Sequence, residues 1–336
     1  MGCHPSAVDH MNAFTALTDS LGRRIDYLRI SVTERCDLRC AYCRPRGVAD
    51  APQEDPLTAD DIVVIAEAAV QLGLRRIRLT GGEPLLRCDL EDIVRRLRTI
   101  PGVEDLALTT NGQMLAARAV GLAAAGLMRV NVSLDSPNPA AYAELTGGGD
   151  VSMVLRGVEA ALDAGLTPVK VNVVLASPSA LDRADLAGFA DIARHKPVHV
   201  RFIEAMPTCG RLSYLPAQQV LDRLAQMGDL RPVEGPRGGG PARYYRLDDS
   251  QGTLGMIAPI SDPFCSQCNR LRVTARGEVL PCLFSPGGIS LLPALRGADP
   301  GESVAALLRH AVAGKPCRYA EVASADGIRA MHVIGG

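Results

Sequence analysis

Residues 27–43 read YLRISVTERCDLRCAYC, a β-rich segment that runs directly into a loop with three cysteines. The alternating apolar and β-branched residues of YLRISV (27–32) predict a strand. Cys36, Cys40 and Cys43 then follow at the spacing C-x3-C-x2-C. A strand that ends in chemically active side chains is therefore the unit to look for in the rest of the chain.

This unit, a strand followed by a polar turn and a helix, recurs along the next 200 residues. β-rich segments occur at 27–32, 76–80, 105–109, 128–134, 168–175 and 197–203. Helical periodicity occurs at 57–73, 88–98, 113–125, 151–164, 182–194 and 216–227. In the first of these helices we expect Thr58 as the N-cap and Gly73 as the stop. Strands that alternate with helices predict a parallel α/β sheet, either open or curved into a partial (β/α)6 barrel of the TIM type.

The alternation of strands and helices breaks after residue 230. Residues 234–243, EGPRGGGPAR, are rich in Gly and Pro and predict a loop. Short strands are predicted in RYYRL, TLGMIA, NRLRVTA and EVLPCLF, and one helix near 303–313. We therefore expect three parts: a variable N-terminal extension (1–22), the barrel (23–233) and a smaller C-terminal α+β extension (234–336).

Composition argues against several classes of protein. The chain of 336 residues is 47% apolar, enough for a sizeable core, and Lys plus Arg (36) nearly balance Asp plus Glu (37). This balance argues against a nucleic acid partner, so an anionic ligand requires a local group of Arg and Lys. No apolar run resembles a signal peptide or is long enough to cross a bilayer. We expect a cytoplasmic protein with reduced thiols, in which clustered cysteines are metal ligands.

Cys36, Cys40 and Cys43 offer three ligands where structural zinc sites and ferredoxin-type clusters use four. No fourth Cys or His follows within the loop. Three thiolates on a four-iron cluster leave one iron open, and an open iron can bind a small molecule through an amine and a carboxylate. Part of a zinc site is the alternative interpretation.

A second set, Cys265, Cys268 and Cys282, has the spacing C-x2-C-x13-C and also lacks a fourth ligand close by. It predicts a second cluster with an open iron, or a zinc site completed by a distant residue. Arg270 and Arg272 lie between these cysteines and share one face of a predicted strand. Two guanidinium groups on one face can bind phosphates, whereas a solvated surface pair is the alternative.

Other cations interrupt the apolar strands. Lys170 stands mid-strand in PVKVNVV, and Arg29 stands similarly in YLRISV. A cation that points into a barrel needs an anionic partner, whereas one that points outward is solvated. Together with Arg78, Arg270 and Arg272, these residues would form a cationic cage for a triphosphate.

The motifs resemble a known family. C-x3-C-x-aromatic-C, with Tyr42 as the aromatic residue, and GGEP (81–84) after the second strand resemble the signature of the radical S-adenosylmethionine (SAM) superfamily. A closer resemblance, to the GTP 3′,8-cyclases of molybdenum cofactor biosynthesis, rests on LRISVTERCDLRCAYC, RLTGGEPLLR, TTNG, NVSLDS, RFIE, GPARYY, CxxCNRLR and the terminal Gly335-Gly336. It covers the chain from about Gly22 to its end.

The resemblance implies a partial barrel closed at its mouth by the C-terminal part, with one [4Fe–4S] cluster at each end of the cavity. It implies that SAM is bound by Tyr42, Gly82, Ser133 and Met206. It places GTP near Arg29, Arg78, Thr109, Lys170, Arg270, Leu271 and Arg272. Gly335 and Gly336 are predicted catalytic residues, because a tail without side chains can enter a crowded active site, whereas a frayed terminus is the alternative.

The implied activity converts GTP to (8S)-3′,8-cyclo-7,8-dihydroguanosine 5′-triphosphate, the first step of molybdenum cofactor biosynthesis. A 5′-deoxyadenosyl radical derived from SAM removes the C3′ hydrogen of GTP, and C3′ then attacks C8 of guanine. The implied partners are a second copy of the chain in a homodimer, a reductant protein of flavodoxin or ferredoxin type, and the cyclic pyranopterin monophosphate synthase that receives the product.

Two rival functions remain. The first is another radical SAM enzyme, one that modifies peptides and carries auxiliary clusters, although that class has more C-terminal cysteines. The second is an electron carrier or a zinc-stabilised binding module, which would not need GGEP or polar groups at the ends of six strands.

Overall fold

The computed structural model describes residues 16–44, 57–175, 183–206, 215–238, 240–322 and 330–335. Most of the expected N-terminal extension and the predicted catalytic residue Gly336 lie outside these ranges.

Six parallel strands form the centre of the sheet and follow one another in chain order. They are β1 (Tyr27–Ser31), β2 (Arg76–Thr80), β3 (Asp105–Thr110), β4 (Arg129–Ser133), β5 (Val169–Leu175) and β6 (Val198–Glu204). All six strands predicted from the sequence are confirmed, and each ends within a few residues of the predicted position.

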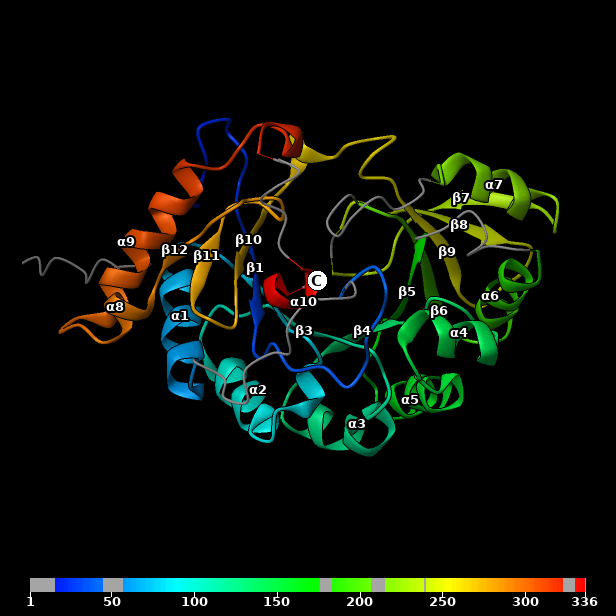
Figure 1. Ribbon diagram of the computed structural model, residues 1–336, viewed down its shortest axis with the longest axis horizontal. Coiled ribbons are helices and arrows are strands. Elements are labelled where there is room, and N and C mark those ends of the chain that lie inside the picture. Colours follow the sequence, from blue (N-terminus) through cyan, green and yellow to red (C-terminus); the bar gives the residue numbers. More distant parts are fainter. Residues whose placement is uncertain are drawn as a thin grey trace, which may run out of the picture.

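Helices connect these strands and lie on the outer side of the sheet (Figure 1). The expected ones are α1 (Ala59–Gln71), α2 (Leu90–Thr99), α3 (Leu115–Ala124), α5 (Val151–Asp163), α6 (Arg183–His195) and α7 (Ala217–Ala225). Helix α1 begins with the predicted Thr58 cap, whose hydroxyl accepts from the Asp61 N–H while the Asp61 carboxylate accepts from the Thr58 N–H. A further helix, α4 (Pro139–Thr146), was not predicted, although Asn138 caps it and Pro139 opens it.

The C-terminal segment lengthens this sheet at both of its edges. Strand β9 (Thr253–Ile257) pairs in parallel with β6, and β10 (Arg270–Val273) pairs in parallel with β1. Antiparallel strands continue outward: β8 (Arg243–Leu247) and β7 (Leu230–Val233) beyond β9, and β11 (Glu278–Leu280) and β12 (Ile289–Ser290) beyond β10. Strand β7 was not predicted. Because one sheet runs through both segments, the expected domain boundary at residue 233 stays a prediction.

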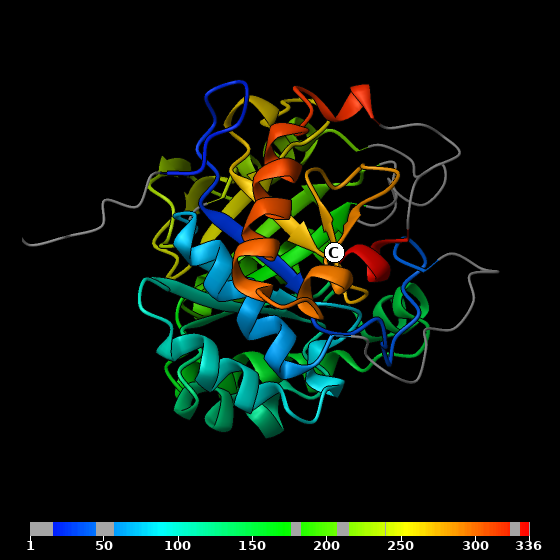
Figure 2. The same cartoon turned by 90° about the vertical axis from the view of Figure 1, so that its left-hand side faces the viewer.

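The sheet curves around a central space with the helices outside it, as Figure 1 shows. Helix α9 (Pro300–Ala313), preceded by the short α8 (Leu292–Leu295), packs beside α1 on the flank seen in Figure 2. The last helix, α10 (Met331–Ile334), lies in the central space. No helix within the described ranges has the length and apolar character needed to cross a membrane.

Alternation along the strands separates an apolar outer face from a polar interior. In β1, Leu28 and Ile30 are fully buried among the core residues, whereas Tyr27 and Arg29 point inward and line a cavity. A partial barrel whose interior side chains are polar is built to hold a polar ligand rather than a packed core.

The N-terminal ends of the strands carry a buried layer of charged groups. Arg129 donates through Nε to the Asp105 carboxylate at 2.7 Å and through Nη2 to the Gly238 carbonyl at 3.3 Å. Lys170 Nζ donates to the Arg237 carbonyl at 2.7 Å. These bonds hold the Gly-rich loop before β8 against this end of the barrel. Burial, together with the positive charges of Arg201 and Arg129, lowers the pKa of Lys170 to about 6.

Glu204, at the end of β6, holds two distant segments to the barrel. Its carboxylate is fully buried and accepts from the backbone N–H groups of Ala217 at 2.8 Å, Ser261 at 2.9 Å and Ile260 at 3.1 Å. The first of these residues opens α7, and the other two lead into the second cysteine set. One buried carboxylate thus fixes where that set begins.

Lys170 gives the ligand-free protein a pH-dependent stability. The unfolded chain holds the lysine proton up to a pH near 10, while the folded chain releases it at about 6. Between these values the unfolded state binds more protons, so the free energy of unfolding rises with pH, by up to about 1.4 kcal/mol per pH unit. Lys170→Met should abolish this rise in urea unfolding measured from pH 6 to 10. Lys196→Met, a surface change beside Glu159, should retain it; equal slopes in the two variants would contradict the assignment.

Glu204→Gln should lower the free energy of unfolding by about 3 kcal/mol, because an amide NH₂ would face backbone donors that now share a carboxylate. The urea midpoint measures this loss. Glu159→Gln is the matched control: it breaks a surface pair with Lys196 and should change stability by about 0.5 kcal/mol or less. Similar midpoints for both variants would exclude the proposed anchoring role.

Candidate active site

A cavity of about 340 Å³ opens inside the curved sheet, at the C-terminal ends of the strands. All six barrel strands contribute to its wall, through their last residues or the turns that follow them. The polar sets expected at the strand ends converge here: the cysteine loop, Gly81 and Gly82, Thr109 to Asn111, Ser133, and Met206. Parallel strands present their C-terminal ends at one side of a barrel, which is why sets far apart in sequence meet.

The first cysteine set lies together on this wall. Cys36, Cys40 and Cys43 are half-buried, and all three line the cavity. Burial raises the pKa of Cys36 to about 12, with the carboxylates of Glu83 and Asp37 adding to the effect. Because a metal ligand must be a thiolate, these thiols need a positively charged group that compensates their burial.

The arrangement suits a cluster. All three cysteines line one cavity, and burial, the Asp135 carboxylate and the thiols of Cys43 and Cys36 raise the pKa of Cys40. Within the described part of the chain, no three His, Cys, Asp or Glu side chains converge as they would around a single metal ion. A four-iron cluster takes a wider set, because each thiolate binds a different iron.

The turn after β2 clamps the cysteine loop through its backbone. Gly82 N–H donates to the Thr33 carbonyl at 2.8 Å, and Glu83 N–H donates to the Arg35 carbonyl at 2.7 Å. A Cβ on Gly82 would lie 2.3 Å from the Arg35 carbonyl oxygen, so only glycine permits this approach. Both glycines of the turn also line the cavity, as expected for a residue near SAM.

Glu83 acts as a brace between strand ends. Its fully buried carboxylate accepts from Thr110 Oγ1 at 2.7 Å, from the Asn111 N–H at 2.6 Å and from the Leu85 N–H at 2.9 Å. Burial raises its pKa to about 7. GGEP by itself suggests an acceptor for the ligand, but this carboxylate is used by the protein and is not part of the cavity wall.

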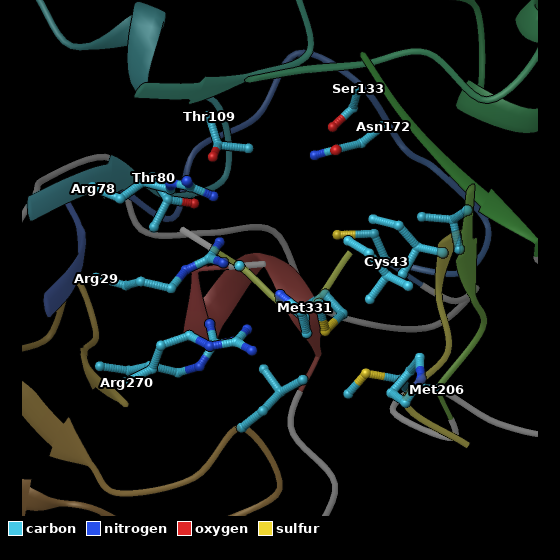
Figure 3. Close-up of a pocket in the computed structure, with 18 of the residues that line it drawn as sticks. Arg29, Cys43, Arg78, Thr80, Thr109, Ser133, Asn172, Met206, Arg270 and Met331 are labelled. Atoms are coloured by element: carbon cyan, nitrogen blue, oxygen red, sulfur yellow. The ribbon is translucent and has the colours of Figure 1, made fainter. Parts of the chain in front are cut away.

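Tyr42 and the other residues expected to contact SAM lie on one side of the cavity. The Tyr42 hydroxyl donates to the Asp135 carboxylate at 2.8 Å, which also accepts from the Val174 N–H at 2.9 Å. Burial raises the pKa of Asp135 to about 6. Ser133 pairs in register with Asn172 on the neighbouring strand. In Figure 3 both residues lie on the same side of the cavity as Cys43 and Met206, across from the labelled arginines.

Arginines form the opposite side. Arg272, Arg29 and Arg78 lie at one level on three adjacent strands, in register. Figure 3 shows Arg29, Arg78 and Arg270 reaching into the cavity toward Cys43 and Met206. Arg78 stacks on the Tyr27 ring at 5.3 Å from its centroid. Its Nε and Thr109 Oγ1 are buried and have no hydrogen-bond partner among the residues that the structure describes.

The charges on this wall are predominantly positive. The cavity is lined by six cationic residues: Arg29, Arg78, Arg201, Arg270, Arg272 and Lys315. Among the described residues that line it, none is Asp or Glu. Burial lowers the pKa values of Arg78 and Arg272 to about 10, and burial with repulsion from Arg272 and Arg78 lowers that of Arg29. A polyanion in the cavity would relieve this repulsion.

The C-terminal tail reaches this arginine wall. The Gly335 carbonyl accepts from Arg272 Nη1 at 3.0 Å and from Arg29 Nη2 at 3.3 Å. Gly335 has φ of 70°, and a Cβ there would lie 2.9 Å from Thr80 Cγ2. Met331, in α10, lies between the arginines and Cys43 in Figure 3. The structure places the Gly335 carbonyl at the arginine wall, whereas Gly336 lies outside the described residues. The catalytic role of the two glycines stays a prediction.

The second cysteine set lines the same cavity. Cys265 opens a 3-10 turn (Cys265–Gln267), and Cys268 and Cys282 flank the β10–β11 pair. Against the effect of burial, the positive charges of Lys315 and Arg270 lower the pKa of Cys268. Burial raises the pKa of Cys282, although the charge of Lys315 opposes this effect there too. Cys268 therefore has the cationic surroundings that a thiolate ligand needs.

Two predicted GTP contacts lie away from the cavity wall. Lys170 is in the buried layer at the other end of β5, and Leu271 is fully buried in the core, so only its backbone is on the cavity side. The lining residues that the sequence analysis missed include Tyr27, Lys315 and Arg201, whose guanidinium donates to the Asn172 and Asn131 amide oxygens at 2.9 Å each. Arg201 interrupts the apolar strand VHVRFI much as Lys170 interrupts its own, which is the signal that could have found it.

Solved structures with a similar fold include SuiB of Streptococcus suis in two states. SuiB bound to precursor peptide SuiA has a TM-score of 0.59 at 15% identity, covering 77% of this chain and 60% of that chain. SuiB bound to S-adenosylmethionine has a TM-score of 0.57 at 15% identity, covering 82% and 61%. Identity this low supports the fold alone.

Sequence comparison is more specific. Residues 30–185 match the model of the Radical SAM superfamily, and residues 198–321 match Molybdenum Cofactor Synthesis C. The GTP 3′,8-cyclase of Pelotomaculum thermopropionicum is 45% identical over 327 residues, covering 95% of this chain and 100% of that protein. The GTP 3′,8-cyclase of Moorella thermoacetica is 42% identical over 325 residues, with the same coverage. The chain therefore belongs to the GTP 3′,8-cyclase family within the radical SAM superfamily.

Proposed function

We propose that this chain converts GTP to (8S)-3′,8-cyclo-7,8-dihydroguanosine 5′-triphosphate, the first step toward the molybdenum cofactor. The observation that carries the proposal is a single cavity with thiols on one side and a row of arginines in register on the other. The thiols are suited to a cluster that binds SAM, and the arginines are suited to a nucleoside triphosphate.

The family's cofactors are SAM and [4Fe–4S] clusters, and the residues of this chain fit them. Cys36, Cys40 and Cys43 would hold the SAM-binding cluster. The chemistry supplied there would be a 5′-deoxyadenosyl radical that takes the C3′ hydrogen of GTP; C3′ would then bond to C8 of guanine, and one electron from the protein reductant proposed below, with a proton, would complete the dihydro product. Tyr42, Gly82, Ser133 and Met206, all on the cavity wall, would bind SAM itself.

The arginine wall would hold the triphosphate. Arg29, Arg78 and Arg272 lie at one level and can each donate two parallel bonds to phosphate oxygens. Arg270, which packs over the Phe264 ring at 5.0 Å, extends the wall toward the second cysteine set. Thr109 Oγ1 and Arg78 Nε, which are buried and have no partner in the described part of the chain, are two groups that such a ligand would satisfy.

Cys265, Cys268 and Cys282 would hold a second cluster that anchors the guanine. Because both sets line one cavity, a nucleotide held by its phosphates and its base has its ribose between them, where C3′ faces the SAM side. The role of the protein is then to fix this geometry and to exclude water and side reactions, since the radical chemistry belongs to the cofactors.

Lys170, unlike the arginines of the cavity wall, does not reach the proposed triphosphate site in this structure. Its ammonium lies at the far end of β5 from the cavity wall and is bound to the Arg237 carbonyl. A direct contact with GTP requires that this bond be exchanged, and an anionic group nearby would favour the protonated form of the amine. Leu271 would contribute through its backbone.

The remaining partners follow from the family resemblance. We propose a homodimer, reduction by a protein of flavodoxin or ferredoxin type, cytoplasmic location, and transfer of the product to cyclic pyranopterin monophosphate synthase. Peptide modification is the rival function, since SuiB, which has a similar fold, binds a precursor peptide. Six cations on the cavity wall, with no carboxylate among the lining residues that the structure describes, favour a nucleotide over a peptide.

The function is tested by separating the two cysteine sets. Cys36→Ala, Cys40→Ala and Cys43→Ala should each abolish reductive cleavage of SAM, because each removes one thiolate of three. The triple variant Cys265→Ala/Cys268→Ala/Cys282→Ala should keep one four-iron cluster by iron analysis and cleave SAM slowly, yet form no cyclised nucleotide. Cys88→Ala, at an exposed thiol, is the control and should keep full activity. Cyclised product from the triple variant would refute the proposed function of its cysteines.

The tail is tested with two glycines of similar backbone conformation. Gly335 has φ of 70° and close neighbours around its Cβ position, whereas Gly165 has φ of 75° and open space there. Gly165→Ala should cost about 1–2 kcal/mol of stability and leave turnover unchanged. Gly335→Ala, and deletion of Gly335 and Gly336, should leave both clusters intact by iron analysis but reduce product formation at least tenfold. Normal turnover in the truncated chain would support a frayed terminus instead.

A further inference from the structure

We propose that Lys315 is a positioning residue of the second cysteine set: its ammonium fastens the segments that carry Cys268 and Cys282 and raises the reduction potential of the cluster held there. The inference rests on the proposed role of Cys265, Cys268 and Cys282 as cluster ligands.

Lys315 is bound at the point where the two cysteine-bearing segments separate. It is 6% exposed, lies just after α9 and lines the cavity. Its Nζ donates to the Arg270 carbonyl at 2.8 Å and to the Pro281 carbonyl at 2.6 Å. Arg270 follows Cys268 by two residues, and Pro281 directly precedes Cys282. The ammonium therefore joins the backbone beside one cysteine to the backbone beside the other.

The strand pairing explains why a side chain is needed there. Strands β10 and β11 pair in register at Arg272 with Leu280 and at Val273 with Val279. Toward the cavity, the next pair in this register is Arg270 with Cys282, but the Cys282 N–H donates to Ser285 Oγ at 3.3 Å instead. Lys315 supplies hydrogen bonds to the Arg270 and Pro281 carbonyls, so its ammonium joins the two strands where their backbone pairing has ended.

Arg23 holds the third cysteine in the same way. It is buried, donates through Nη1 to the Cys265 carbonyl and through Nη2 to the Pro316 carbonyl, at 2.8 Å each. Its charge is neutralised by Asp19. Lys315 instead donates to two neutral carbonyls beside Cys268 and Cys282, so its charge faces the sulfurs of this set and a cluster held by them. Burial lowers the pKa of Lys315, and negative charge on these sulfurs opposes that effect. Positive charge beside an iron–sulfur cluster favours the reduced state.

The choice of lysine is itself informative. The chain contains 33 arginines and only three lysines, at 170, 196 and 315. Lys196 pairs with Glu159 on the surface, whereas Lys170 and Lys315 are buried and donate to backbone carbonyls. A compact ammonium directs both bonds from one nitrogen, whereas a planar guanidinium such as that of Arg23 spreads its bonds over two nitrogens. Substitutions can therefore separate the charge of Lys315 from its geometry.

The experiment uses the full-length Cys36→Ala/Cys40→Ala/Cys43→Ala variant as the parent, so that the second cluster is observed alone. After anaerobic reconstitution with iron and sulfide, iron per chain, the midpoint potential by EPR-monitored titration, and the rate of iron loss to a chelator are measured. Lys315→Met should shift the potential to more negative values and speed iron loss severalfold. Lys315→Arg should keep the potential near that of the parent but lose iron faster. Lys196→Met should match the parent in both.

The outcomes separate the two hypotheses. A parent that binds no iron overturns the ligand assignment and this inference with it. A parent that binds iron, together with Lys315→Met that has the parent's potential and rate of iron loss, overturns the inference alone. If Lys315→Met is unfolded by circular dichroism, Lys315→Arg decides: iron retention equal to that of the parent refutes the positioning role.

Discussion

The positive charge inside the barrel is the constraint on which the rest of the structure depends. Six cations line one cavity, no described lining residue is acidic, and the pKa values of Arg29, Arg78 and Arg272 are lowered by burial and by other arginines. Guanidinium groups are placed this way only at a cost in folding free energy. A chain with a net charge of −1 thus concentrates its cations where a polyanion is to be bound.

The fold tolerates this cost because the interior is surrounded on its outer side by a continuous apolar layer. Core residues such as Leu28, Ile30 and Val130 are fully buried between strands and helices. The inner face of the same strands can then be polar. At the N-terminal ends, Asp105 pairs with Arg129, and backbone carbonyls of the loop before β8 accept from Arg129 and Lys170. The buried cations at the N-terminal ends of the strands therefore have partners within the protein. The cations at the C-terminal ends line the cavity, where an anionic ligand can bind them.

The local sequence predicted the positions of helices and strands better than it predicted which strands pair with one another. The six barrel strands and most helices follow from alternation, periodicity and caps such as Thr58. Strand β7 was missed because LRPV is short and contains a proline. Strands β9 and β10 extend opposite edges of the sheet by pairing in parallel with β6 and β1. The local sequence of a strand does not predict such a partner, because parallel strands are joined by long connections and pair with segments far away in the chain.

The site shows the same difference between what local sequence predicts and what it does not. Cysteine spacing identified both sets, but the function of Glu83 depends on partners from the next strand, and that of Lys315 on two distant carbonyls.

The clamp on the first cysteine loop has a consequence for how the holoenzyme is made. Backbone bonds from Gly82 and Glu83 on one side, and from Arg39 to the Thr146 carbonyl on the other, shape the loop with protein groups alone. In zinc fingers the metal supplies the folding energy, and the metal-free chain is unfolded. Here backbone hydrogen bonds within the protein offset the conformational entropy that the loop loses on folding. We therefore expect the cluster to assemble on a chain that is already folded. Oxidative loss of iron should then leave a folded chain that can be refilled.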